Sequence, residues 1–140
     1  MKALLRECGL PVKGRGQTMP SQAFPEAPAP DGRTVHLRLI GTTDLHQHLL
    51  PYDYHADRPM PGIGLCTAAD LIDAARSEVR NALLFDNGDF LQGNPMGDHI
   101  AHDRGIRRGD PHPMIAAMNT LGYDAITLGN HEFNYGLDFL

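Results

Sequence analysis

The sequence predicts an α/β fold built from parallel βαβ units. Three apolar runs have the pattern of β-strands, two stretches with helical spacing separate them, and polar residues follow each run directly. With 140 residues, of which 41% are hydrophobic, the chain can form one modest domain with its own core. Strands that alternate with helices pair in parallel through right-handed crossovers, and such sheets bind ligands at the carboxyl ends of their strands.

The folded part is predicted to span residues 34–140, after a leader formed by residues 1–33. The leader is rich in proline and has neither strand nor helix periodicity, so we expect it to be disordered. Arg6, Glu7 and Gly9 interrupt its apolar start, whereas a signal peptide needs about 7 to 15 uninterrupted apolar residues. We therefore expect neither a signal peptide nor a membrane-spanning segment.

Charge and cysteine content exclude further classes of protein. The formal net charge of −5 leaves no broad basic surface for a nucleic-acid duplex. Cys8 and Cys66 are far apart and lack metal-site spacing, which argues against a disulfide framework and against a zinc finger. We expect Cys66 to be a small buried residue.

The first βα unit is predicted from two patterns. Apolar residues at every second position predict a strand over residues 35–40 with one better-buried face. Thr67 is the expected N-cap of the helix that follows, with Asp70 three residues on and apolar residues at helical spacing through Val79. The helix should have about three turns.

The second unit begins with a buried strand over residues 82–85, which a turn ends. Asn94 and Pro95 have the pattern of an N-cap and the first residue of a short helix. Residues 103–109 are expected to form a charged loop.

Another helix is predicted over residues 110–121, with Met114 and Met118 filling the core and Gly122 as the C-terminal cap. A third strand over residues 125–128 completes the predicted sheet.

Asp44 and His46 follow the first strand, two residues apart. In an extended segment both side chains point to the same side, so one divalent metal ion can take both. A turn-capping aspartate and a surface histidine are the alternative for this pair alone. His48 has the same phase, but the chain should turn before it, so we expect it to support the ligands or to be exposed.

Asp89 follows the second strand directly after Gly88, and a glycine lets the backbone approach a crowded centre. The two oxygens of its carboxylate can bridge two cations, although aspartate is also common in turns. Asp86 is the other candidate, and it can instead anchor the turn or support the metal ligands without touching the metal.

Asn130 and His131 follow the third strand. An amide oxygen is a neutral, hard ligand for a second metal ion, while the neighbouring imidazole must point elsewhere, toward substrate. There it can stabilise charge on a phosphoryl group or protonate a leaving alkoxide. Taken together, the three sets predict a site for two divalent metals that hydrolyses a phosphate ester. Four further histidines stand in polar or loop sequence and are expected on the surface: His55, His99, His102 and His112.

Three sequence blocks resemble the calcineurin-like metallophosphoesterases of the 5'-nucleotidase group: TTDLH at 42–46, NGDFLQGNP at 87–95 and GNHEFNYG at 129–136. The resemblance covers residues 35–140. Residues 51–59 and Asn134 are most similar to the branch of 2',3'-cyclic-nucleotide 2'-phosphodiesterase/3'-nucleotidases. In 5'-nucleotidases an aspartate that orients the histidine commonly stands where this chain has Asn134, and a neutral amide favours the imidazolium less.

The resemblance implies the N-terminal part of a β-sheet/helix sandwich and a role for each candidate residue. Asp44 and His46 would hold the first metal, Asp89 would bridge, Asn130 would hold the second metal, and His131 would be the catalytic imidazole. Family members continue with further histidine ligands and a C-terminal domain that grips the base. We therefore expect residues 34–140 to be the N-terminal portion of a truncated metallophosphoesterase domain.

The implied activity is hydrolysis of 2',3'-cyclic nucleotides to 3'-nucleotides and then to nucleoside and phosphate, with two divalent ions such as Mn, Zn, Co or Mg. We expect the chain to be inactive alone, and to be a monomer whose partner is a small nucleotide. A 5'-nucleotidase-type hydrolase and a non-catalytic fragment are the alternatives. Relatives of this branch are periplasmic, which implies that location, with the cytoplasm as the alternative.

Overall fold

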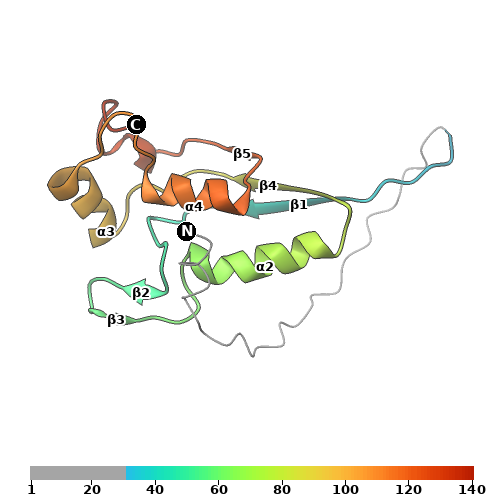
Figure 1. Cartoon of the computed structure of the whole chain (residues 1–140), viewed down its shortest axis with the longest axis horizontal. Helices are drawn as coiled ribbons and strands as arrows, with labels where there is room; N and C mark the ends of the chain where they lie inside the picture. Colours follow the sequence, from blue (N-terminus) through green and yellow to red (C-terminus); the bar gives the residue numbers. More distant parts are fainter. Residues whose placement is uncertain (1–30) are drawn as a thin grey trace.

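The computed structural model describes residues 31–140, so nearly all of the predicted leader lies outside the described residues. Its centre is a three-stranded parallel sheet in the order β1-β4-β5 (Figure 1). The strands are β1 (Leu37–Thr42), β4 (Asn81–Asp86) and β5 (Ala125–Ile126). The parallel α/β fold expected from the sequence is therefore present.

The remaining elements are helices and one small hairpin. The longer helices are α2 (Leu65–Ser77) and α4 (Pro113–Leu121). The short α3 (Pro95–Asp98) continues into a π-helical segment, η1 (His99–Arg104), and the chain near its end forms a 3-10 turn, η2 (His131–Phe133). The hairpin pairs β2 (Tyr52–Asp53) with β3 (Arg58–Pro59).

Both long helices cover the same face of the sheet, and the strand order explains why. Each strand is added on the same side of the one before it, so two right-handed crossovers place their helices on one face. Leu84 on β4 is fully buried in the core, together with Leu65 and Ile72 of α2 and Met114 and Met118 of α4. The two methionines therefore fill the core as predicted.

The opposite face of the sheet is open in the described part of the chain. Leu37 and Leu39 of β1 are 56% and 66% exposed, and Phe85 of β4 is 37% exposed. The half-buried positions of β1 are instead Arg38, Ile40 and Thr42. The alternation in the sequence correctly predicts a two-faced strand, but its aliphatic Leu37–Leu39 face is the exposed one.

The first helix begins earlier than predicted. α2 starts at Leu65, directly after Gly64, whose φ of +87° suits glycine and whose added Cβ would lie 2.7 Å from the backbone oxygen of Leu50. Thr67 is thus inside the first turn rather than the N-cap, and its hydroxyl donates to the Ile63 carbonyl at 2.8 Å. The helix ends at Ser77, before Val79.

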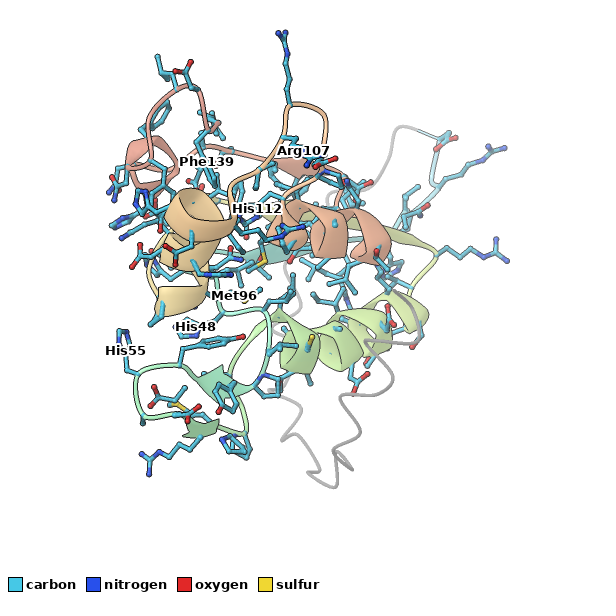
Figure 2. The ribbon with its side chains drawn as sticks, turned by 60° about the vertical axis from the view of Figure 1, so that its left-hand side comes forward. His48, His55, Met96, Arg107, His112 and Phe139 are labelled. Atoms are coloured by element: carbon cyan, nitrogen blue, oxygen red, sulfur yellow. The ribbon has the colours of Figure 1, made fainter. Side chains whose placement is uncertain are left out.

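The second long helix begins later than predicted, at Pro113. A residue before proline is disfavoured in the helical conformation, and His112 is extended with φ −57° and ψ 139°. Its Nδ1 accepts from the Met114 amide at 3.1 Å, so His112 is the N-cap. Because this cap is only 7% exposed and lies near the Phe139 ring (Figure 2), the prediction of a surface histidine at this position is wrong. Gly122 caps the other end in the left-handed conformation, as predicted.

Two smaller differences concern one loop and the last strand. Asn94 caps α3 as predicted, but part of the expected charged loop belongs to η1. The third strand has two residues, and its neighbours through Leu128 are not paired as strand. Among residues 31–140 no helix combines the length and apolar character needed to span a bilayer.

Candidate metal centre

The segment after β1 has an unusual backbone that places the first two candidate ligands. Asp44, His46 and Gln47 have φ values of 54°, 43° and 59°, in the left-handed region that non-glycine residues seldom adopt. Such residues cost about 1 to 3 kcal/mol each and persist only where their surroundings hold them. Two of these three residues, Asp44 and His46, are ligand candidates from the sequence.

Hydrogen bonds to the loop after β4 hold this segment. The amides of Asp44, His46 and Gln47 donate to the carbonyls of Gly88, Asp89 and Phe90 at 3.0, 2.8 and 3.0 Å. The two loops thus continue the pairing of their parent strands past the end of the sheet. This pairing brings the Asp44 and His46 segment beside Asp89.

The loop after β4 also meets the loop after β5 at very short range. A Cβ added to Gly88 would lie 2.3 Å from the Gly129 nitrogen, and one added to Gly129 would lie 2.2 Å from Oδ1 of Asp89. Asp89 itself is left-handed, with φ 62°, and its Oδ1 accepts from the His131 amide at 2.9 Å. Asp89 and His131 are therefore neighbours, although 42 positions separate them in the sequence.

A buried carboxylate joins these two loops. Glu132 is 0% exposed and accepts four backbone hydrogen bonds. The donors are the amides of Asp89 at 2.7 Å, Phe90 at 2.7 Å, Leu91 at 3.0 Å and Gly129 at 2.6 Å. Four donors satisfy a carboxylate that would otherwise be expensive to bury.

The ring of His46 is oriented for coordination through Nε2. Its Nδ1 lies 3.0 Å from the Gln92 carbonyl, which can only accept, so the ring proton is on Nδ1. The lone pair of Nε2 is then free to bind a cation, as in many protein metal sites. Nε2 lies 3.6 Å from Oδ1 of Asp44, whose side chain is 57% exposed.

His131 has the opposite ring arrangement. The Asn134 amide nitrogen lies 2.9 Å from Nδ1 of His131 and also donates to the Gln92 side-chain oxygen at 3.3 Å. Because Nδ1 accepts from this amide, the ring proton is on Nε2, which can donate to a bound group. The His46 and His131 rings meet edge to face, with centroids 5.0 Å apart.

Three of the candidate residues form a group suited to a divalent ion. Ligand atoms of His46, Asp89 and His131 all lie within 4.8 Å of one another, and Asp44 adjoins them through His46. Carboxylate oxygen together with imidazole nitrogen suits Zn²⁺ and its neighbours. His46 and Asp89 therefore offer a divalent metal an imidazole nitrogen and a carboxylate oxygen, and the His131 ring lies beside them. Asn130 is exposed and directly precedes His131, and its role at a second metal stays a prediction.

The other carboxylate considered from the sequence, Asp86, does not belong to this group. It is 2% exposed, and its side chain accepts from the Thr42 hydroxyl and, at 2.8 Å, from the Gly88 amide. Burial is the main cause that raises the pKa of Asp86. Its role is to anchor the turn that precedes Asp89, which was the second possibility for this residue.

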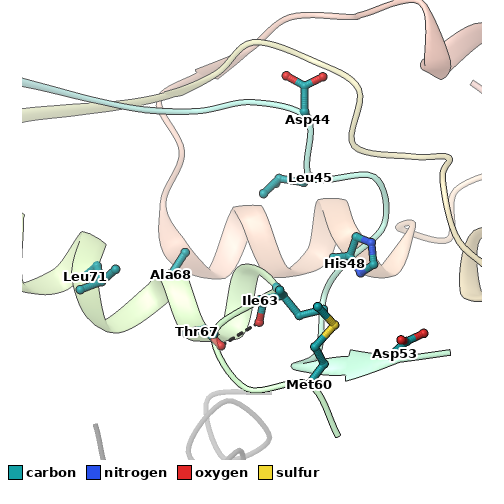
Figure 3. Close-up of a pocket in the computed structure, with 11 residues that line it drawn as sticks. Asp44, Leu45, His48, Asp53, Met60, Ile63, Thr67, Ala68 and Leu71 are labelled. Carbon is teal, nitrogen blue, oxygen red and sulfur yellow. Dashed lines mark hydrogen bonds between the residues drawn. The ribbon is translucent and has the colours of Figure 1, made fainter. Parts of the chain in front are cut away.

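A cleft of about 550 Å³ adjoins the centre on the side of the hairpin (Figure 3). Asp44, Leu45 and His48 line it where it meets the site, and Met60 and Ile63 line its apolar part. His48 is half-buried beside the cleft and outside the cation-binding group, so it is not exposed, and its expected support of the ligands stays a prediction.

The remaining histidines are distributed as follows. His55 lies on the hairpin, exposed and pointing away from the molecule (Figure 2). His99 and His102 are exposed on η1. The expectation of surface positions is therefore confirmed for these three histidines, in contrast to His112.

Sequence reasoning missed two contributors to the centre. Glu132 was not singled out, although an acidic residue directly after His131 in a glycine-containing loop was a usable signal. The Gln92 carbonyl, which orients His46, is a backbone group and leaves no trace in the residue type.

Comparison with solved structures defines the class of protein. The chain superposes on the crystal structure of the calcineurin-like phosphoesterase YfkN from Bacillus subtilis with a TM-score of 0.71 and 49% identity, over 75% of this chain and 32% of that chain. The resemblance seen in the sequence is thereby confirmed, and the fold is that of the N-terminal part of a calcineurin-like phosphoesterase.

Two curated proteins with similar sequences act on nucleotide phosphoesters, according to their names. The chain is 52% identical over 107 residues to the 2',3'-cyclic-nucleotide 2'-phosphodiesterase/3'-nucleotidase of Salmonella typhimurium, which covers 76% of this chain and 16% of the relative. It is 50% identical over 109 residues to the trifunctional nucleotide phosphoesterase protein YfkN of Bacillus subtilis, over 76% of this chain and 8% of the relative. A scan against models of protein families found no match. These relatives are hydrolases of nucleotide phosphoesters, and the chain spans less than a fifth of their length.

Proposed function

We propose that this chain carries the first part of a two-metal phosphoesterase centre that hydrolyses 2',3'-cyclic nucleotides to 3'-nucleotides and then to nucleoside and phosphate. The observation that carries the proposal is that His46, Asp89 and His131 converge. They come from three loops at one edge of the sheet, and their ligand atoms lie within 4.8 Å of one another. The name of the Salmonella relative supports the substrate class. The chain by itself is proposed to be inactive.

Each residue has a proposed role that follows from its surroundings. Asp44 and His46 hold one cation, because the Gln92 carbonyl keeps the His46 proton on Nδ1 and leaves Nε2 free. Asp89 is central to the group and bridges two cations through its carboxylate. Asn130 offers an amide oxygen to the second cation.

Bound divalent cations would polarise the phosphoryl group and make water more acidic. The proposed contribution of His131 is a hydrogen bond. With Asn134 donating to Nδ1, Nε2–H can donate to a phosphoryl oxygen and stabilise the charge that grows there, while the water oxygen bonds to phosphorus, the bond from phosphorus to the 2' oxygen breaks, and the 2' oxygen takes up the proton that the water releases. The 3' phosphate left by this step can then occupy the same position for a second hydrolysis.

The whole chain has a formal net charge of −5, which repels an anionic nucleotide. A nucleotide substrate therefore needs a local neutral or positive surface near the centre. We propose that the cations themselves supply this charge. A small nucleotide is then the partner, and the protein acts as a monomer. From the resemblance we also propose a periplasmic location.

Metal binding is the first test. Calorimetry with Zn²⁺ or Mn²⁺ on the 140-residue chain should show binding that Asp89→Asn weakens at least tenfold, because the central carboxylate loses its charge. Asp103→Asn is the control, since Asp103 is an exposed carboxylate on η1. Equal binding by wild type and Asp89→Asn would contradict the proposed centre.

Activity is tested in a chimera. Residues 34–140 replace the matching segment of the Salmonella relative, and the chimera is offered 2',3'-cyclic AMP, 3'-AMP and 5'-AMP. We expect metal-dependent hydrolysis of the first two, abolished by Asp89→Asn and retained in His55→Asn. Preference for 5'-AMP would instead identify a 5'-nucleotidase-type enzyme, and an inactive chimera that folds would favour a non-catalytic segment.

A further inference from the structure

We propose that Glu132 is a positioning residue of the metal centre. Its buried carboxylate fixes the loop that carries Asp89 against the loop that carries His131, and so determines whether the two side chains can serve one centre. The inference rests on the proposed function, because the positioning is useful only if a cation binds there. Glu132 acts through other groups and is therefore not a catalytic residue.

The donors to Glu132 are arranged around a single concavity. Three successive amides, those of Asp89, Phe90 and Leu91, converge on the Glu132 carboxylate at 2.7 to 3.0 Å. Successive amides that point into one concavity, with one residue left-handed, form an anion-binding nest. Here the anion that fills the nest is a side chain of the protein itself.

The position of Glu132 in the chain lets it act on both loops. It directly follows His131, and its second oxygen also accepts from the Gly129 amide at 2.6 Å. One carboxylate therefore holds the backbone on both sides of His131 and three residues of the opposite loop. The bond from the His131 amide to Oδ1 of Asp89 closes the connection at the ligand itself.

The close approach of the two loops leaves no room for another side chain that could join them in place of Glu132. Gly88 and Gly129 lie so near each other that a Cβ added to Gly88 would lie 2.3 Å from the opposite backbone, so no bridging side chain fits there. Without Glu132 the four amides lose a charged acceptor, and the left-handed Asp89 loses the bond that holds its nitrogen. The loop is then free to relax, and the Asp89 carboxylate with it.

Three variants test whether Glu132 acts by positioning the two loops. The alternatives are a role in folding alone and simple attraction between the Glu132 charge and a nearby cation. Glu132→Gln removes the charge at nearly constant shape. Glu132→Asp keeps the charge but shortens the side chain by one methylene, so it cannot reach all four donors. Ile72→Ala is the matched control for lost stability, because Ile72 is 4% exposed and belongs to α2.

The experiment measures two quantities on the 140-residue chain. The first is hydrogen exchange of the four donor amides without metal, which reports directly whether Glu132 protects them. The second is the Zn²⁺ dissociation constant from calorimetry, measured where each variant is fully folded. Relative to Ile72→Ala, we expect both Glu132 variants to exchange these amides about tenfold faster or more, and to bind Zn²⁺ about 10-fold to 100-fold more weakly.

The outcomes distinguish this inference from the proposed function. Wild-type affinity in Glu132→Asp would show that charge alone matters, and equal weakening in Ile72→Ala would show an effect of stability; either result overturns positioning and leaves the metal centre intact. A wild-type chain that binds no Zn²⁺ overturns the proposed function and this inference together. If Glu132→Gln fails to fold, the comparison is made with Glu132→Asp. Rapid exchange of the four amides in the wild type would by itself overturn the positioning role of Glu132.

Discussion

Gly88 and Gly129 meet backbone to backbone, although they belong to loops that follow different strands. An added Cβ on Gly88 would lie 2.3 Å from the Gly129 nitrogen and 2.8 Å from its Cα. This approach brings Asp89 within hydrogen-bonding distance of the His131 amide. The absence of two side chains thus permits the geometry of the candidate centre.

Gly129→Ala should therefore destabilise the protein by about 1 to 3 kcal/mol, because the new methyl group overlaps the Asp89 carboxylate and backbone. Urea unfolding measures the change. Gly41→Ala is the matched control: a Cβ at Gly41 meets no atom within 4 Å, so its free energy of unfolding should change by less than about 0.5 kcal/mol. Similar losses in the two variants would contradict the close approach.

Asn94→Ala should cost about 1 to 3 kcal/mol, since it removes more than a helix cap. The Asn94 side chain accepts from the amides of Met96 and Gly97 and donates to the His46 carbonyl at 3.0 Å. The left-handed His46 segment should loosen as well, which hydrogen exchange of the His46 amide would report. Asn119→Ala, at an exposed position of α4, should leave both measurements almost unchanged.

Acid should destabilise the protein through His112. Burial lowers the pKa of this imidazole from 6.5 to about 4, so the unfolded chain binds the proton more readily than the folded one. The stability contributed by the neutral ring is complete above pH 6.5 and is lost as the pH falls toward 4. A difference of about 2.5 in pKa corresponds to about 3 kcal/mol.

His112→Asn tests this assignment, because asparagine can accept from the Met114 amide as the cap but does not titrate. Its unfolding free energy should fall less between pH 6.5 and 4 than that of the wild type. His102→Asn, which changes an exposed histidine, should keep the wild-type pH dependence. Parallel pH profiles for wild type and His112→Asn would show that His112 is not the group responsible.

The open face of the sheet makes a prediction about two leucines. Leu39→Lys should change the unfolding free energy by less than about 0.5 kcal/mol, since Leu39 is 66% exposed on an edge strand. Leu84→Ala should cost about 2 to 5 kcal/mol, because Leu84 is fully buried against the helices. Urea titrations compare the two, and a large loss in Leu39→Lys would mean that this face is covered in solution.

Periodicity predicted the elements better than it predicted their ends. The alternation over residues 35–40 correctly indicated a strand, and helical spacing indicated α2 and α4. The first residue of α2 depended on Gly64, which only the close backbone of Leu50 explains. His112 was misjudged because burial of a polar N-cap depends on what packs over it, here the Phe139 ring, and no local pattern carries that information.

The sequence by itself determined the kinds of atoms available at the centre and the strand end from which each starts. It could do so because strand and glycine patterns are local and parallel strands share an edge. Only the tertiary structure decided that Glu132 joins the two loops, that the Gln92 carbonyl orients the His46 ring, and that the aliphatic face of β1 is open. Those features depend on contacts between residues tens of positions apart, and a distance of that kind is fixed by packing rather than by any neighbouring residue.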